Sequence, residues 1–154
     1  MHGTTGYYKL SFDIVPRGTV SDWGSILHFT IGENFHHFGG RAPGFWFFPG
    51  NTRLHCVIGD SSESYWNWSI NPHHELPLNV HTKVTLECNG PSVKLTVGGH
   101  VYTAVQPTHR FAGKLLVYAG DPWYPNANAE INGFEYEILP ATGAKPGMHV
   151  LHDC

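Results

Sequence analysis

A stiff aromatic loop follows an apolar strand in the last third of the chain. Residues 114–119 have the β-favouring character of a buried strand. The Asp-Pro pair that begins at Asp121 ends this strand, because proline donates no ladder hydrogen bond and restrains the residue before it. Trp123 and Tyr124 then lie between two prolines and have little freedom to lose. Aromatic rings pack on the apolar faces of sugars, and carboxylates accept from sugar hydroxyls. We therefore predict that Asp121 and Trp123 bind carbohydrate, with the alternative that Trp123 folds back to close the end of the core.

A second loop, around residues 35–41, gathers aromatic, histidine and arginine side chains. Two glycines before Arg41 permit unusual backbone angles, and long ordered loops on β-sandwiches often carry function. The guanidinium of Arg41 is a planar fork of donors that suits vicinal hydroxyls or a carboxylate. We predict that His37 and Arg41 contribute to the carbohydrate site. The structural alternative is that Arg41 pairs with a core carboxylate such as Asp121.

The neighbouring strands offer Arg53, His55 and Asn67 on faces opposite the apolar ones. His55 belongs to the alternating run 53–59, and Asn67 belongs to the run 64–70. We predict that both contact carbohydrate. Asn67 also begins the glycosylation sequon Asn-Trp-Ser, and a glycosylated Asn67 could not line a ligand site.

The chain has twelve histidines, but their spacing does not suit a metal ion. Adjacent histidines, as in His36-His37 and His73-His74, point to opposite faces of a strand and chelate poorly. Neither Cys-x-x-Cys nor His-x-x-x-His spacing occurs in the sequence. We predict no metal site and no cofactor. Because imidazoles titrate near neutral pH, we expect ligand binding or assembly to be sensitive to acid.

The length of 154 residues fits one domain, and the composition disfavours several kinds of partner. Lys and Arg together number nine and are scattered, and the formal net charge is −3, which argues against nucleic acid. No apolar stretch is long enough to insert across a membrane. The first five residues lack the positive start and apolar centre of a signal peptide. We expect either that such a peptide has been removed or that the protein is not secreted by that route.

Three cysteines leave one without a partner. Strand alternation turns Cys56 and Cys88 toward the apolar side, where they form either a disulfide or two small buried side chains. Cys154 is the last residue of a polar tail and is either free or bridges two chains.

Strand periodicity runs through almost the whole chain, with glycine and proline between the runs. It predicts about ten short strands, a hairpin about Gly98-Gly99 and no amphipathic helix. Many short antiparallel strands in a chain of this size indicate an all-β sandwich or barrel. We expect residues 1–140 to form this domain and residues 141–154 to form a C-terminal tail. The predicted strands are residues 7–14, 25–31, 44–48, 53–59, 64–70, 81–88, 92–97, 100–105, 115–119 and 131–139.

Five segments carry a family resemblance: residues 25–29, 40–47, 84–99, 116–124 and 131–134. Through them, residues 7–139 resemble the concanavalin A-like lectin/glucanase superfamily, particularly its galectin-like and laminin-G-like modules. The resemblance implies an all-β, antiparallel, two-sheet β-sandwich of the jelly-roll kind. Its curved sheets often bind glycans on the concave face.

The known sites of the superfamily do not carry over to this chain. Galectins use a His-x-Asn-x-Arg strand and a later Trp-x-x-Glu, whereas residues 44–48 have no polar triad and Trp66 lacks the following glutamate. The segment Glu130-Ile-Asn-Gly-Phe-Glu135 is similar to the Glu-x-Asp-x-x-Glu strand of the glucanases, which resemble retaining hydrolases with one glutamate as nucleophile and one as acid. Here Asn132 replaces the aspartate, and the segment lies in the last strand. We therefore predict that the chain is not an enzyme.

These patterns predict a carbohydrate-binding protein, a lectin, that recognises glycans through aromatic stacking and a few polar residues. A single site of this kind is usually weak, and the strand at residues 44–48 is apolar on both faces and needs cover, so we expect a homo-oligomer. We expect an extracellular or secreted location. The alternatives are a glycoside hydrolase of the glucanase type, carried by Glu130 and Glu135, and a non-enzymatic protein-interaction or adhesion module.

Overall fold

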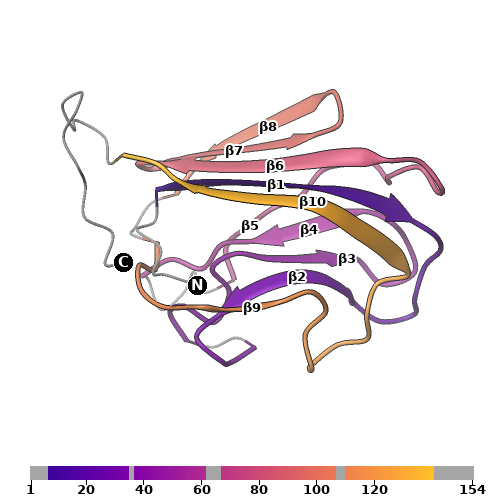
Figure 1. Ribbon diagram of the computed structural model, residues 1–154, viewed down its shortest axis with the longest axis horizontal. Helices are drawn as coiled ribbons and strands as arrows, with labels where there is room; N and C mark the ends of the chain where they lie inside the picture. Colours follow the sequence, from indigo (N-terminus) through magenta and orange to yellow (C-terminus); the bar gives the residue numbers. More distant parts are fainter. Residues whose placement is uncertain (1–6, 35–36, 62–66, 107–109, 141–154) are drawn as a thin grey trace.

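The protein folds as two stacked β-sheets (Figure 1) in a computed structural model, which describes residues 7–34, 37–61, 67–106 and 110–140. Each sheet has five antiparallel strands, and none of the described residues is helical. No helix in these ranges is therefore long and apolar enough to cross a bilayer. The strands are β1 Tyr8–Pro16, β2 Gly24–Thr30, β3 Gly44–Phe47, β4 Leu54–Val57, β5 Ser69–Ile70, β6 Thr82–Asn89, β7 Ser92–Val97, β8 His100–Val105, β9 Leu116–Tyr118 and β10 Ala129–Ile138.

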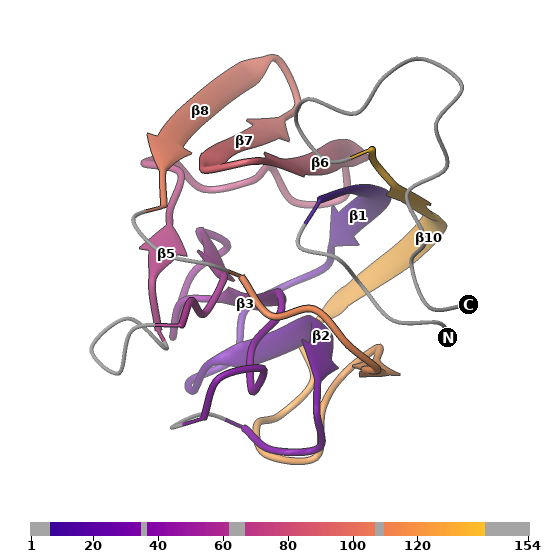
Figure 2. The same ribbon diagram turned by 90° about the vertical axis from the view of Figure 1, so that its left-hand side faces the viewer.

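Consecutive strands make up most of each sheet: β2 to β5 belong to the second sheet, and β6 to β8 belong to the first. The first sheet has the order β10-β1-β6-β7-β8, and the second sheet has the order β5-β4-β3-β2-β9 (Figure 2). The predicted all-β antiparallel sandwich is confirmed. The predicted run 64–70 is shorter in the structure, where β5 covers Ser69–Ile70 and residues 62–66 lie outside the described residues. The predicted tail, with Cys154, also lies outside them.

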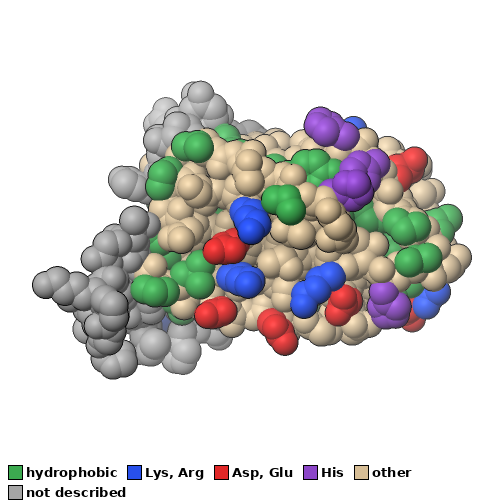
Figure 3. Space-filling model, turned by 90° about the horizontal axis from the view of Figure 1, so that it is seen from above, with side chains coloured by type: hydrophobic (Ala, Val, Ile, Leu, Met, Phe, Trp, Pro, Cys, Tyr) green, Lys and Arg blue, Asp and Glu red, His purple; other side chains and the backbone are tan. Residues whose placement is uncertain are grey.

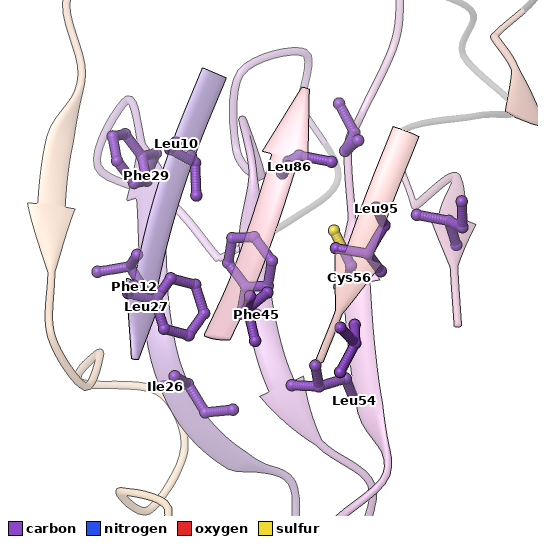
Figure 4. Close-up of a cluster of buried hydrophobic side chains, with 14 of the residues drawn as sticks. Leu10, Phe12, Ile26, Leu27, Phe29, Phe45, Leu54, Cys56, Leu86 and Leu95 are labelled. Atoms are coloured by element: carbon purple, nitrogen blue, oxygen red, sulfur yellow. The ribbon is translucent and has the colours of Figure 1, made fainter. Parts of the chain in front are cut away.

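The core lies between the sheets because alternate residues of each strand turn inward (Figure 4). Leu10, Phe12 and Leu86 of the first sheet face Phe45 and Leu54 of the second sheet. The rings of Phe12 and Phe45 meet edge to face with their centroids 5.1 Å apart, a geometry that aromatic quadrupoles favour. Burying each such side chain stabilises the fold by about 1.5–3 kcal/mol, so this layer fixes how the sheets stack.

The cysteines Cys56 and Cys88 are both free and fully buried in this core. Of the two alternatives, the buried thiols are therefore correct and the disulfide is wrong. Burial raises the pKa of Cys88 to about 11 and raises that of Cys56 well above its usual value. Both thiols stay protonated at neutral pH, which makes them poor nucleophiles.

The outer face of the first sheet is a ladder of alternating charges (Figure 3). Residues at paired positions across β10, β1, β6 and β7 are Glu137, Lys9, Glu87 and Lys94. Each opposite-charge pair contributes about 0.2–1 kcal/mol. The ladder ends at the uncharged Thr103 of β8. Such a face suits contact with water, and the aromatic side chains discussed next gather on the other sheet.

Candidate functional site

The outer face of the second sheet is the side of this sheet that turns away from the core. Phe45 of β3 points into the core, so its neighbours Gly44 and Trp46 project outward. By the same alternation β4 projects His55 outward and β2 projects His28. Strand pairing sets Trp46 beside His55 and His28 beside Gly44. The sheet thus places one indole and two imidazoles on one surface.

Trp46 is the centre of this face and is only 1% exposed. Its indole lies over Gly44, where an added Cβ would come within 2.2 Å of the ring. The guanidinium carbon of Arg41 lies 4.5 Å from the indole centroid, and the ring of Tyr124 packs edge-on at 6.2 Å. The second apolar side of β3 is therefore covered by the chain's own loops. The oligomer was predicted partly because both faces of residues 44–48 need cover, and this reason does not hold.

The indole N–H of Trp46 is buried and has no hydrogen-bond partner among the described residues. Leaving a buried donor unpaired costs about 1–3 kcal/mol, and such groups are uncommon in folded proteins. A ligand oxygen that accepted this N–H would recover this energy, provided that the side chains of Arg41 and Tyr124 over the indole shifted slightly. The indole nitrogen is therefore a candidate ligand contact.

Arg41 holds the loop before β3 in place. Its Nε donates to the carbonyl oxygen of Asn34 at 3.0 Å, and its Nη2 donates to Asn34 Oδ1 at 3.2 Å. Its Nη1 donates to Oδ1 of Asn67. Burial lowers the pKa of Arg41, while Tyr124 and Asp121 act in the opposite direction. Arg41 is thus largely committed to protein partners, and it stacks on the indole of Trp46.

The carboxylate of Asp121 is buried and fixes the stiff loop to the sheet. Its Oδ2 lies 2.9 Å from Nδ1 of His28, and its Oδ1 accepts the backbone N–H groups of Trp123 and Tyr124, each at 3.0 Å. Burial opposes ionisation of Asp121, but these hydrogen bonds outweigh it and lower the pKa of the carboxyl. The other nitrogen of His28, Nε2, lies 2.6 Å from the carbonyl oxygen of Gly40. The Asp121 carboxylate therefore ties together the loops at residues 40 and 121–124 through one imidazole.

His55 is a neutral imidazole with one nitrogen unused. Its Nδ1 lies 2.9 Å from Oδ1 of Asn71 and donates to it. Burial lowers the pKa of His55 to about 4; the charges of Arg41 and Arg53 add to this effect, and the bond to Asn71 opposes it. At neutral pH the proton is therefore on Nδ1, so Nε2 is an acceptor for which the described residues supply no partner.

Aromatic rings surround this acceptor. The centroid of Trp23 lies 4.8 Å from those of both His55 and Phe48. The guanidinium carbon of Arg53 lies 4.6 Å from the centroid of Phe48, and Arg53 Nε donates to the carbonyl oxygen of Pro72 at 2.9 Å. The described residues supply no partner for the terminal nitrogens of Arg53. Trp23, Phe48 and Arg53 are all half-buried, so ligand atoms can reach them.

All the predicted site residues except His37 touch Trp46, His28 or Arg41 on this face. Trp123 is 36% exposed and packs edge-on against His28, with the two ring centroids 5.5 Å apart. His37 points to solvent, where its Nδ1 pairs with the carboxylate of Glu33. The sequence left open the alternative that Arg41 pairs with a core carboxylate such as Asp121. In the structure the side chain of Arg41 donates to Asn34 and Asn67, and the carboxylate of Asp121 bonds to His28.

Several residues of the face could not be singled out from the sequence. His28 and Trp46 had a usable signal, because each occupies the outward position of a strand whose neighbours on both sides are apolar. Arg53 also had a signal, because it shares the polar side of the run 53–59 with His55. Trp23 and Phe48 had none, because sheet register and turns bring them to the face. Within the described ranges, no group of three His, Cys, Asp or Glu side chains could hold a metal ion.

The glutamates of the hydrolase alternative lie on β10, in the first sheet. Glu130 is exposed and forms an ion pair with Arg17, whose Nη2 lies 2.6 Å from the carboxylate. Glu135 is also exposed and pairs with Ser11 of β1 in the sheet register. Neither belongs to the outer face of the second sheet.

Comparison with known proteins places the fold. A scan against protein-family models finds no match, and neither does a search of curated protein sequences. Similar solved structures include a Trypanosoma rangeli sialidase in complex with sialic acid, with a TM-score of 0.59 and 12% identity over 85% of this chain and 20% of the sialidase. Chicken galectin 2 has a TM-score of 0.50 and 12% identity over 89% of this chain and 98% of the galectin. A Bacillus licheniformis β-glucanase has a TM-score of 0.50 and 15% identity over 86% of this chain and 65% of the glucanase.

These likenesses show the fold alone, because the identities are so low. The chain spans about a fifth of the sialidase and nearly the whole galectin. The predicted resemblance is confirmed at the level of the fold: the chain has the antiparallel two-sheet sandwich fold that these proteins share.

The prediction that the chain is not an enzyme is contradicted by the same comparison. A sialidase and a β-glucanase contain this fold, as does a galectin. The prediction failed because it rested on one glutamate motif, and the fold accommodates catalysis. The enzymes share only 12–15% identity with this chain, which does not make it an enzyme.

Proposed function

We propose that the protein binds carbohydrate on the outer face of the second sheet. One observation carries the proposal: donors and acceptors for which the described residues supply no partner lie among aromatic rings. The donors are Nε1 of Trp46 and the terminal nitrogens of Arg53, and the acceptor is Nε2 of His55. Trp23 and Phe48 flank them.

This mixture matches a sugar better than it matches an ion or a purely apolar ligand. A sugar hydroxyl both donates and accepts, so it can use a neutral imidazole and an N–H group together. The apolar C–H face of the same sugar packs on an aromatic ring. The proposal extends to a secreted protein that acts as an oligomer, because several weak sites acting together raise avidity.

The face has two accessible parts, and the ligand can contact either or both. One part is the His55 part, formed by Trp23, Phe48, Arg53 and His55. The other is the Trp123 part, formed by the exposed Trp123 where it packs against His28. Asn67, also exposed, belongs to the same face through its bond to Arg41. The covered Trp46 lies next to both parts, through His55 and through His28.

The test starts with a glycan array on the wild-type protein, followed by calorimetric titration of the best ligand into variants. We expect Trp23→Ala and Arg53→Gln each to weaken binding by about 1–3 kcal/mol, the scale of a stacked ring or a charged hydrogen bond. Trp123→Ala measures the contribution of the second part. Lys94→Gln on the opposite sheet is the matched control and should leave affinity unchanged. Failure of every glycan to bind, or full affinity in both Trp23→Ala and Arg53→Gln with an intact fold, would refute the site.

A further inference from the structure

The strand β8 is an edge of the first sheet among the described strands (Figures 1 and 2), and its register with β7 fixes which of its backbone groups face outward. The two-residue hairpin pairs Val97 with His100, which fixes His100, Tyr102 and Ala104 as the residues that bond to β7. The backbone bond from Gln106 N to the carbonyl oxygen of Pro91 continues the same alternation. The N–H and C=O groups of the intervening residues therefore face away from the sheet.

Those intervening residues are Val101, Thr103 and Val105. All three are β-branched and favour an extended backbone. Val101 is 57% exposed and Val105 is 71% exposed. Natural edge strands are usually protected by lysine, proline, a bulge or a charge that points inward. The β8 segment has no Lys, Arg, Asp, Glu or Pro, and its pairing with β7 shows no register shift.

The other three edges are less suited to pairing. β5 has two residues and β9 has three, so each offers few backbone groups. β10 is long, but it carries Glu130, Glu135 and Glu137 and has an irregular register. Pairing β10 with itself would bring like charges together, which is destabilising. Length and charge thus single out β8.

We propose that β8 pairs with β8 of a second copy of this chain, antiparallel about a two-fold axis at Thr103. In this register Thr103 lies opposite the partner's Thr103, and Val101 lies opposite the partner's Val105. Each Thr103 then exchanges both backbone hydrogen bonds with its counterpart, as its outward N–H and C=O require. The two first sheets become one continuous sheet of ten strands.

Charges permit this arrangement. The nearest charged neighbour of Thr103 across the strands is Lys94 on β7. In the dimer the two copies of Lys94 are separated by three strand spacings, about 14 Å. This exceeds the Debye length of about 8 Å at physiological salt, so their repulsion is screened. The outer faces of both second sheets stay uncovered. The pairing does not depend on the proposed function, but it would give two ligand faces to one particle.

The test measures the oligomeric state of the full chain by sedimentation equilibrium under reducing conditions, which removes any contribution of Cys154. We expect a monomer–dimer equilibrium for the wild type. Two double variants test the register with substitutions at the same positions. Val101→Lys with Val105→Lys sets like charges against each other at both cross-strand pairs and should abolish the dimer. Val101→Lys with Val105→Glu sets opposite charges against each other and should retain it.

Two further variants test the edge itself. Thr103→Pro removes an outward N–H that β7 does not use, so it should give a folded monomer, with the fold checked by circular dichroism. Thr96→Lys, on the same face but inside the sheet, is the control and should leave the dimer intact. A wild type that stays monomeric, including one that captures an extended peptide at β8, would overturn the proposal. So would a dimer that survives Thr103→Pro, or equal behaviour of the two double variants.

Discussion

Mild acid should destabilise the protein through His55. Burial holds the pKa of this imidazole at about 4 in the folded protein, against its usual 6.5. Between these two values the unfolded chain binds a proton that the folded chain does not, so stability falls as the pH falls. The stability is full above about pH 6.5, and the loss is complete below about pH 4. The fall of the His55 pKa from 6.5 to about 4 corresponds to at most about 3 kcal/mol, of which about 2 kcal/mol is lost by about pH 5.

The assay compares wild type with His55→Gln by urea unfolding at a series of pH values. Glutamine is a neutral amide that does not titrate. The substitution will change the free energy of unfolding by some constant amount, so the informative quantity is how the difference between the proteins varies with pH. The eleven other histidines contribute equally to both proteins and cancel. A difference that stays constant between about pH 7 and about pH 4 would show that His55 is not buried as a neutral group, and the acceptor role of its Nε2 would fall with it.

Three other predictions follow from the packing of the face and the core. Gly44→Ala should destabilise the fold by about 1–3 kcal/mol in thermal or urea unfolding, because the added carbon strikes the ring of Trp46; an unchanged midpoint would mean that the ring moves freely. Asp121→Ala should cost about 3–5 kcal/mol at neutral pH and Asp121→Asn clearly less, since asparagine still accepts from the loop amides. Because the hydrogen bonds lower the pKa of the folded carboxyl, the penalty should shrink only as the pH falls below the usual range of an aspartate, where the unfolded carboxyl takes up a proton before the folded one. Equal costs for the two variants would argue against this network. Cys56 and Cys88 should not react with Ellman's reagent until the protein unfolds, and fast reaction of either in the native state would contradict their burial.

The sandwich could be predicted because its main signals are local. Alternation along a strand depends only on which residues face the core, so runs such as 81–88 and 131–139 could be recognised one at a time. The Gly98-Gly99 hairpin was equally local, since a two-residue glycine turn is favoured between two strands. What remained open was how the strands pair, because register across β2, β3 and β4 is a property of contacts far apart in the sequence.

The site was harder to predict because some of its residues hold the face together and others can contact a ligand, and the residue type does not distinguish the two roles. Arg41 and Asp121 have the residue types expected of a sugar site, yet both are buried and bonded to protein groups. Trp23 showed no pattern in the sequence and joins the face only when strands pair and turns close. Arg53 could be placed beside His55 by strand alternation, but its stacking on Phe48 could not be predicted. The prediction of a non-enzyme went wrong for a related reason: one missing motif was taken as evidence against a whole class of chemistry.

The residues that build the face differ from those that can contact a ligand in how many of their hydrogen-bonding groups are unused. Asp121 accepts from His28 and from two backbone amides, so little of its capacity remains. His55 keeps one nitrogen, Arg53 keeps its terminal nitrogens, and Trp46 keeps its indole N–H. A ligand gains most where groups are desolvated but unpaired, because binding then restores bonds that folding has left unmade. This moves the expected centre of recognition from the stiff loop to the paired strands β3 and β4, where rigid backbone holds the donors and the acceptor in place without a cost in loop ordering.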